Sequence, residues 1–169
     1  MKIVCLLIAF LTSALFTGVQ AAENLALYGK ATQSTIVRSP WTAEGSPRNA
    51  IDGNSDGNFH HGSCSHTDRQ LKPWWRVDLL KRYKITSVVI TNRDGYAERL
   101  NGAEIRIGNN LVDNGTRNPL CAVISSIPAG DLETFQCKNG MEGRYVTVVI
   151  PGRAEYLTLC EVEVYGYGQ

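Results

Sequence analysis

The chain of 169 residues is 43% hydrophobic, and its 17 lysine and arginine residues nearly balance 16 aspartate and glutamate residues, for a formal net charge of +1. The charges are interspersed, so the chain lacks the basic patch of proteins that bind nucleic acid or anionic membranes. This composition predicts one globular domain with a substantial core, and neither nucleic-acid binding nor membrane insertion.

The first 21 residues have the three parts of a secretory signal peptide. Lys2 supplies the positive start, residues 3–16 are almost wholly apolar, and Val19-Gln20-Ala21 has small residues at the positions that a signal peptidase reads. A membrane helix needs about 20 apolar residues, and this run is interrupted by polar residues and a glycine. We expect cleavage after Ala21, a single domain over residues 22–169, and a secreted, extracellular protein.

Beyond residue 21 no stretch has a helical period, and short alternating or β-branched runs occur instead. They lie at residues 75–79, 84–91, 103–107, 145–150 and 159–165. Turn signals stand between them at Asp52-Gly53, Asp94-Gly95, Asn114-Gly115, Asn139-Gly140 and Pro151-Gly152. Many short strands with such turns predict an all-β antiparallel sandwich or barrel, in which function is expected on the loops at one end.

Residues 49–54, Asn-Ala-Ile-Asp-Gly-Asn, followed by Ser63, place several oxygen-bearing side chains around a glycine turn. Clustered oxygens suit a hard cation such as calcium. An ordinary turn stabilised by asparagine and aspartate side chains explains the same residues. Composition alone favours the ordinary turn, because no EF-hand spacing is present.

Three histidines and one cysteine fall within seven residues at positions 60–66. Such a group is typical of a zinc site, but an oxidised Cys64 would not offer a thiolate. A serine hydrolase is also disfavoured, since Ser63 does not stand in a Gly-x-Ser-x-Gly turn.

Arg93 and Arg99 flank a turn that follows the predicted strand 84–91. Their guanidinium groups offer planar sets of donors, which suit vicinal sugar hydroxyls or a carboxylate. Solvated charges with local ion pairs are the alternative. Trp41, Phe59, Trp74 and Tyr96 are candidates for an apolar wall beside the arginines, although such aromatics more often lie in a core, where we expect Trp74 or Trp75.

Four cysteines remain beyond the signal peptide: Cys64, Cys121, Cys137 and Cys160. An even number in an oxidising compartment predicts two disulfides, for which three pairings are possible. Asn114-Gly115-Thr116 is an N-glycosylation sequon that a secreted chain can use.

Across these segments the chain resembles the F-type lectins, or fucolectins, a branch of the discoidin-like β-sandwiches. The likeness covers residues 23–164, and its most specific parts are residues 49–54, 59–66, 73–79, 92–94 and 98–99. The family places a histidine 27 positions before the first arginine of the loop, as His66 stands before Arg93 here. The resemblance implies a discoidin- or jelly-roll-like antiparallel β-sandwich that binds fucose.

The resemblance also implies a sugar site. His66, Arg93 and Arg99 match the polar triad, whose nitrogens would donate hydrogen bonds to the ring oxygen and to the 2-, 3- and 4-hydroxyls of fucose. Val37, Trp41, Phe59 and His60 match an apolar pocket for the C6 methyl group, which distinguishes fucose from galactose. Asp78 is expected to hold an arginine in place.

A structural calcium ion beside the sugar site is a further implication. The family's ligands match Asn49, Asp52, Asn54, Ser63, Cys160 and Glu161. The disulfides would be Cys64–Cys160 and Cys121–Cys137, and the first would join the two halves of the ion site.

One departure concerns the loop between the two arginines. Many family members carry two adjacent cysteines there, and their disulfide packs against the sugar ring. This chain has Gly95-Tyr96-Ala97 in a loop one residue shorter. Either Tyr96 replaces the disulfide as a stacking surface, or the shorter loop moves Arg99 and weakens or retunes binding.

The leading interpretation is a lectin for fucosylated glycans on cell surfaces or glycoproteins, in innate defence or gamete recognition. Because single sugar sites bind weakly, we expect a homo-oligomer. The rival is a discoidin-like adhesion module that binds a protein or membrane surface through exposed side chains such as Trp41. An enzyme such as a glycosidase would need two positioned carboxylates, and no such pair stands out.

Overall fold

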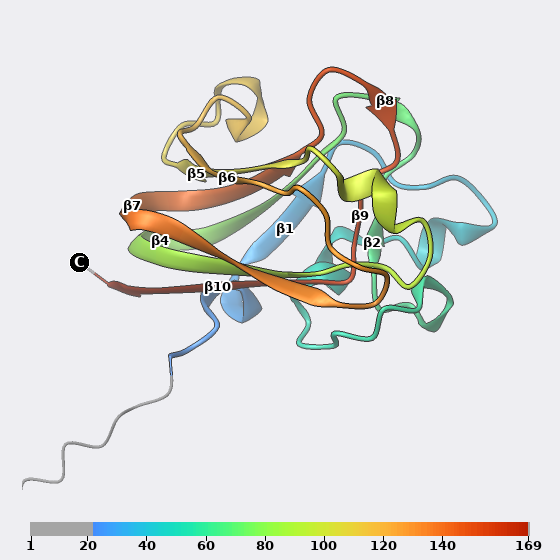
Figure 1. The fold of residues 1–169 in the computed structure, drawn as a ribbon, viewed down its shortest axis with the longest axis horizontal. Helices are drawn as coiled ribbons and strands as arrows, with labels where there is room; N and C mark the ends of the chain where they lie inside the picture. The colour runs from blue at the N-terminus through green and yellow to red at the C-terminus, as the bar shows by residue number, and fades with distance from the viewer. Residues whose placement is uncertain (1–21, 169) are drawn as a thin grey trace, which may run out of the picture.

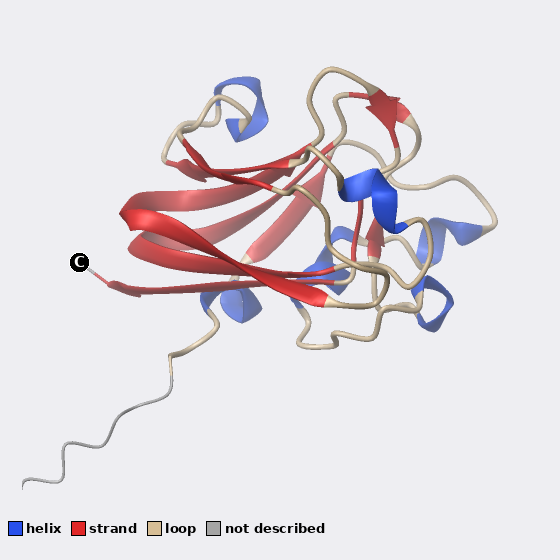
Figure 2. Cartoon of the chain, in the orientation of Figure 1, coloured by secondary structure: helices blue, strands red, loops and turns tan. Residues whose placement is uncertain are grey.

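The computed structural model describes residues 22–168, so the predicted signal peptide lies outside the described residues. This part of the chain is built from antiparallel β-strands with short 3₁₀ helices of three to five residues (Figures 1 and 2). The prediction of an all-β fold is confirmed. Within residues 22–168, no helix has both the length and the apolar character needed to cross a bilayer.

The ten strands are β1 (Lys30–Gln33), β2 (Ser65–His66), β3 (Gln70–Leu71), β4 (Trp74–Thr91), β5 (Glu104–Gly108), β6 (Leu120–Val123), β7 (Leu132–Val149), β8 (Ala154–Glu155), β9 (Thr158–Leu159) and β10 (Glu161–Gly168). The 3₁₀ helices are η1 (Leu25–Tyr28), η2 (Trp41–Ala43), η3 (Pro47–Ile51), η4 (Phe59–His61), η5 (Ala97–Leu100) and η6 (Val112–Gly115).

The two 18-residue strands, β4 and β7, pair with each other and run through both halves of the sandwich. The first part of β4, residues 74–78, lies between β1 and the end of β7. Its second part, residues 83–91, lies between β10 and the start of β7. The main sheet thus has the order β1-β4-β7-β5-β6, with β10 also paired to β4.

The side chains of both halves enclose one hydrophobic core. Val77 and Val148 enter it from the first half, and Ile85 and Val164 enter from the second, all fully buried. Trp75 is also fully buried, and its indole nitrogen donates to the carbonyl of Pro47 at 2.9 Å, which ties η3 to the core. Burial of each such side chain contributes about 1.5–3 kcal/mol.

One prediction of separate strands and one prediction of a turn are wrong. Residues 75–79 and 84–91 were expected as separate strands, but they form the single strand β4. The segment between them has no glycine or proline, and Leu80 takes a left-handed backbone (φ 69°) where the register breaks. Asn139-Gly140 is a bulge within β7 and does not end a strand, although both residues have positive φ as such a turn would require.

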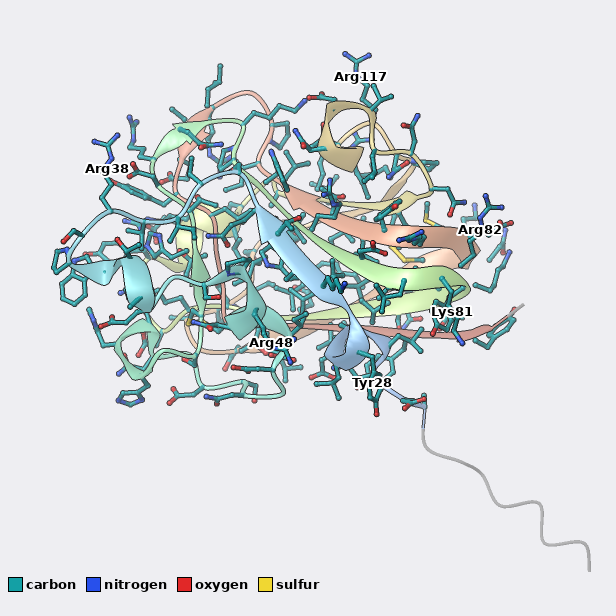
Figure 3. The ribbon with its side chains drawn as sticks, turned by 180° about the vertical axis from the view of Figure 1, so that it is seen from behind. Tyr28, Arg38, Arg48, Lys81, Arg82 and Arg117 are labelled. Carbon is teal, nitrogen blue, oxygen red and sulfur yellow. A yellow bond between two sulfur atoms is a disulfide. The ribbon has the colours of Figure 1, made fainter. Side chains whose placement is uncertain are left out.

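The loops gather at the end of the sandwich opposite the chain's C-terminus. There η2, η4, η5 and the short strands β2, β8 and β9 lie around one another, far from the bends in the middle of β4 and β7 (Figure 1). Figure 3 shows the labelled basic side chains spread around the molecule, which agrees with the lack of a basic patch. The gathered loops are the place to look for a binding site.

Candidate functional site

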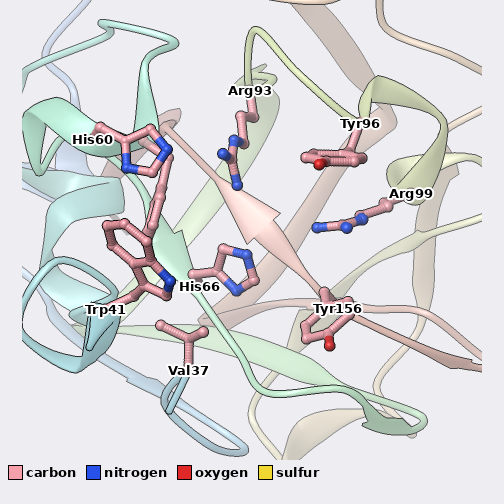
Figure 4. Close-up of a pocket in the computed structure, with 9 residues that line it drawn as sticks. Val37, Trp41, His60, His66, Arg93, Tyr96, Arg99 and Tyr156 are labelled. Atoms are coloured by element: carbon pink, nitrogen blue, oxygen red, sulfur yellow. The ribbon is translucent and has the colours of Figure 1, made fainter. Parts of the chain in front are cut away.

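One pocket of about 310 Å³ opens among these loops (Figure 4). Its lining residues are Val37, Trp41, Phe59, His60, His66, Arg93, Tyr96, Arg99 and Tyr156. The segment 34–45, η4, β2, the loop after β4, η5 and the link between β8 and β9 each supply part of the wall. Eight of these nine residues were predicted for the sugar site, and the structure brings all eight together.

His66 lies at the floor of the pocket and is 5% exposed. Its Nδ1 is 2.7 Å from the carbonyl oxygen of Thr67. Burial, opposed by this hydrogen bond and reinforced by the charges of Arg93 and Arg99, holds the pKa of His66 below its ordinary value of 6.5. The ring is therefore neutral near pH 7, and because a carbonyl can only accept, Nδ1 carries the proton and Nε2 is an acceptor.

This assignment corrects one expectation. We expected the His66 nitrogen to donate to the ligand, as the arginines do. The neutral ring instead offers an acceptor between two donors. A hydroxyl group both donates and accepts, so such a site suits a ligand hydroxyl better than a carboxylate, which can only accept.

Arg93 is held over the ring of Phe59, with Cζ 4.7 Å from the ring centroid. Its loop is fixed by buried Asn92, which donates to the carbonyls of Ala97 and Ile127 and accepts from the Arg93 amide. The Arg93 Nε is buried and has no hydrogen-bond partner within residues 22–168. Burial and the neighbouring charge of Arg99 lower the pKa of Arg93. A cation kept without a partner in a pocket is available to a ligand.

Arg99 completes the polar side despite the shortened loop. It lies between the rings of Tyr96 and Tyr156, at 4.0 Å and 4.7 Å from their centroids (Figure 4). Glu155 is the nearest acid, 3.8 Å from its Nε. The shorter loop therefore does not carry Arg99 away from Arg93 and His66.

The opposite wall of the pocket is apolar. Phe59 is buried, and the rings of Trp41 and His60 meet it edge-on at 6.5 and 5.4 Å between centroids. Gln33 fastens the segment that carries Trp41, because its side-chain amide donates to the carbonyls of Thr35, Gly45 and His66.

Gly45 allows this segment to approach the floor of the pocket. A Cβ on Gly45 would lie 2.8 Å from a methyl group of Val37 and 3.1 Å from the carbonyl oxygen of His66. Only a glycine fits this approach without a shift of the wall.

Asp78 is not part of the pocket, and that expectation is corrected. It accepts two hydrogen bonds from Arg144, at 2.7 and 2.8 Å, across β4 and β7. Asp78 does hold an arginine, but one on the sheet. Tyr156 and Glu155, beside Arg99, are the residues that sequence reasoning missed.

The segments of the predicted calcium site meet beside the pocket. The Gly53 amide donates to Glu161 at 3.3 Å, the Asn49 side chain donates to the carbonyl of Cys64, and Asp52 accepts from the Asn54 amide. Ser63 donates to the carbonyl of Asn58. Within residues 22–168, no group of three or more histidine, cysteine or acidic side chains forms a metal cluster.

Glu161 is the unusual member of this corner. It is 1% exposed, and its Oε2 accepts no hydrogen bond within the described residues. Burial, together with the nearby charge of Asp52, raises its pKa to about 7. A buried carboxylate oxygen without a partner is costly unless a cation meets it.

Both predicted disulfides are present, Cys64–Cys160 and Cys121–Cys137. The first leaves no thiolate for the zinc alternative. His60 and His61 lie near Glu44 and Asp56 instead, at 3.8 and 2.6 Å.

Comparison with known proteins agrees with this architecture. Residues 49–148 match the family model of NedA-like, galactose-binding domains. A fucolectin from Anguilla anguilla is 55% identical over 143 residues, which cover 84% of this chain and 90% of the relative.

Two solved structures extend the likeness. A fucolectin from the serum of Morone saxatilis, the striped bass, superposes with a TM-score of 0.82 at 58% identity. The match covers 88% of this chain and 48% of that one, so this chain spans about half the length of the bass protein. A fucose-binding module of Streptococcus pneumoniae, SpX-3, has a TM-score of 0.69 at 29% identity, over 86% of this chain and 99% of the module.

Proposed function

This chain belongs to the fucolectin family of F-type lectins, and on that premise we propose that it binds terminal L-fucose on glycans and catalyses no reaction. The observation that carries the proposal is the two-sided pocket. Two arginines and a neutral histidine stand on one side, and an aromatic and aliphatic wall stands on the other. The names of its relatives, fucolectins and a fucose-binding module, support the same ligand.

The polar side would take the hydroxyl edge of the sugar. Arg93 and Arg99 donate to the hydroxyl and ring oxygens, and Nε2 of His66 accepts a hydrogen from one hydroxyl. The lowered pKa of His66 keeps this acceptor free at neutral pH. Because the arginines only donate and Nε2 of His66 only accepts, the site fixes the direction in which each bound hydroxyl group points.

The apolar side would take the C6 methyl group. Val37, Trp41, Phe59 and the face of His60 line that side of the pocket. Burial of one methyl group contributes roughly 0.8 kcal/mol, and galactose would place a hydroxyl there without a partner. This wall is the basis for selection of fucose over galactose.

We also propose a structural calcium ion at the corner of Asn49, Asp52, Asn54, Ser63, Cys160 and Glu161. The support is the buried, unpartnered Oε2 of Glu161 beside the charge of Asp52. Carboxylate and carbonyl oxygens are the ligands that calcium prefers, so the donor set fits the ion. The ion would neutralise the corner and would not touch the sugar.

The remaining proposals concern the whole protein: secretion to the extracellular space, a homo-oligomer that presents several sites to fucosylated cell surfaces or glycoproteins, and a glycan on Asn114. A relative isolated from serum supports secretion. Asn114 lies exposed on η6, in a segment remote from the pocket.

A glycan-array screen of the protein tests the ligand class. Fucosylated glycans should bind, free L-fucose should compete, and galactose should not. Binding that is insensitive to fucose would refute the proposal and would favour the discoidin-like adhesion module.

A further inference from the structure

Tyr96 and Tyr156 surround Arg99 in a way that neither residue's sequence position predicts. Tyr96 comes from the loop after β4, and Tyr156 comes from the link between β8 and β9. Their rings lie on opposite sides of the Arg99 guanidinium (Figure 4), at 4.0 and 4.7 Å from its Cζ. Both distances are within the range of a cation–π interaction.

The guanidinium of Arg99 has little else to hold it. Its side chain makes no hydrogen bond within residues 22–168, and Glu155 approaches its Nε only to 3.8 Å. The backbone is better anchored, because Arg153 donates to the Arg99 carbonyl at 2.8 Å. The backbone of Arg99 is thus fixed by a hydrogen bond, whereas its charged end is held by the two rings and by a long ion pair with Glu155.

Tyr96 also lies close to the second cation of the site. The Cζ of Arg93 is 5.4 Å from the same ring, so the electron-rich face region of Tyr96 meets both guanidinium groups. Tyr96 has a left-handed backbone (φ 62°), although the glycine before it would adopt that conformation at lower cost. The loop accepts this strain at the residue that carries the ring.

From this geometry we propose that Tyr96 and Tyr156 form a clamp that positions Arg99 for the sugar. The two tyrosines are positioning residues that act through Arg99. In the alternative, Tyr96 serves as a platform against the sugar ring, and loss of its ring would weaken binding without a change at Arg99 in the ligand-free protein. The inference rests on the proposed fucose site for its binding consequence, but the clamp itself exists without ligand.

Leucine and phenylalanine substitutions separate the ring from the rest of the residue. Tyr96→Leu and Tyr156→Leu should each weaken L-fucose binding, measured by titration calorimetry, by roughly tenfold, because a cation–π contact is lost. Tyr96→Phe and Tyr156→Phe keep the ring and should recover most of that loss. Tyr167→Leu is the matched control, since Tyr167 is 59% exposed, as Tyr96 is at 58%, and lies on β10 outside the pocket.

A second measurement reports on the clamp without any ligand. It is the NMR resonance of the Arg99 Nε–H group in the ligand-free protein. Ring currents from two stacked tyrosines should shift it upfield in the ¹H–¹⁵N spectrum, and each leucine variant should move it back. Phenylalanine variants as weak as the leucine variants, or an Arg99 resonance that is the same in all proteins, would overturn the clamp. If wild type binds no fucose but the resonance moves as expected, the proposed function fails and the clamp stands.

Discussion

Two charged sites of opposite sign lie side by side at one end of the sandwich. Each site holds a buried polar atom without a hydrogen-bond partner among the described residues, the Nε of Arg93 in the pocket and the Oε2 of Glu161 in the corner. The two arginines are only half-buried, whereas Glu161 is 1% exposed. The pocket is stable without a ligand, because aromatic rings stabilise its partly exposed cations. The corner is less tolerant, because the charged form of Glu161 is buried without a partner, and burial therefore raises its pKa to about 7.

The disulfide Cys64–Cys160 connects the two sites. Both cysteines are buried and form a small cluster with Phe59, the ring that supports Arg93, and with Val37 of the apolar wall. Glu161 follows Cys160 directly in the chain, and Ser63 precedes Cys64. Loss of the corner should therefore be felt in the pocket, whereas loss of the pocket should leave the corner intact.

Replacement of Arg93 should abolish sugar binding in the pocket without an effect on the neighbouring corner. Arg93→Ala should reduce L-fucose affinity at least about a hundredfold, since two charge-assisted hydrogen bonds are each worth about 1.5–3 kcal/mol. Arg93→Lys should also bind poorly, because an ammonium group lacks the planar set of donors. Titration calorimetry measures the affinity, and the response of the melting temperature to calcium should stay that of wild type.

Arg117→Ala is the control for this variant, since Arg117 projects from the loop after η6 (Figure 3). Wild-type fucose affinity in Arg93→Ala would show that the pocket is not the sugar site.

The link between the sites should break with the Cys64→Ala/Cys160→Ala double variant. We expect a loss of about 2–5 kcal/mol in the free energy of unfolding, with weaker fucose binding because Phe59 rests on the bridge. Denaturant unfolding and calorimetry measure the two effects.

Cys121→Ala/Cys137→Ala is the matched control. This bridge spans 16 residues and joins β6 to β7 within the sheet, so its removal should cost stability and leave fucose affinity unchanged. Equal losses of affinity in the two double variants would contradict the proposed connection.

The corner should respond to removal of calcium. Calcium at 100 times its dissociation constant would add about 2.7 kcal/mol, so a chelator should lower the melting temperature by several degrees. Glu161→Gln keeps the size of the side chain and removes its charge, so this variant should lose most of the calcium response and melt above wild type in chelator.

Glu163→Gln, on the same strand but half-exposed, is the control and should keep the calcium response. A wild-type melting curve that is identical with and without chelator would rule out a structural ion.

The sequence predicted the strands of the sheet and the residues of the pocket to different extents. Alternating β-branched runs mark the buried strands, because burial on one face imposes the period of two. The bend at Leu80 carries no such mark, because leucine rarely takes a left-handed backbone, and here its amide donates to the Asp78 side chain two residues before it. The edge strand β6, Leu120–Val123, was missed because half of its side chains are exposed and no alternation results.

The pocket residues were predicted from a family pattern. Such a pattern identifies positions in the chain but does not say which residues contact one another in space. Tyr156 lies outside the motif and enters the pocket only because β8 and β9 pair with β3 and β2. Asp78 was misplaced for the same reason, since a residue of the family motif can contact the sheet and not the site. The nature of His66 as an acceptor depends on its contact with the Thr67 carbonyl, which the sequence cannot specify.

The smallest expected effect is a pH dependence of fucose affinity that comes from His66 in the pocket. Burial and the charges of Arg93 and Arg99 hold the pKa of His66 below 6.5, so the proton is bound more weakly in the folded protein than in the unfolded chain. This group therefore lowers stability only below about pH 6.5, and its Nε2 stays an acceptor above that value. L-fucose affinity should be constant from pH 8 to about 6.5. It should fall at lower pH, by up to tenfold (about 1.4 kcal/mol) per pH unit once His66 is protonated, because binding must then release a proton.

His61→Asn is the control and should show the same pH profile as wild type, since His61 contacts Asp56 outside the pocket. Affinity that already declines between pH 8 and 7 would contradict a neutral His66 as the acceptor of a sugar hydroxyl.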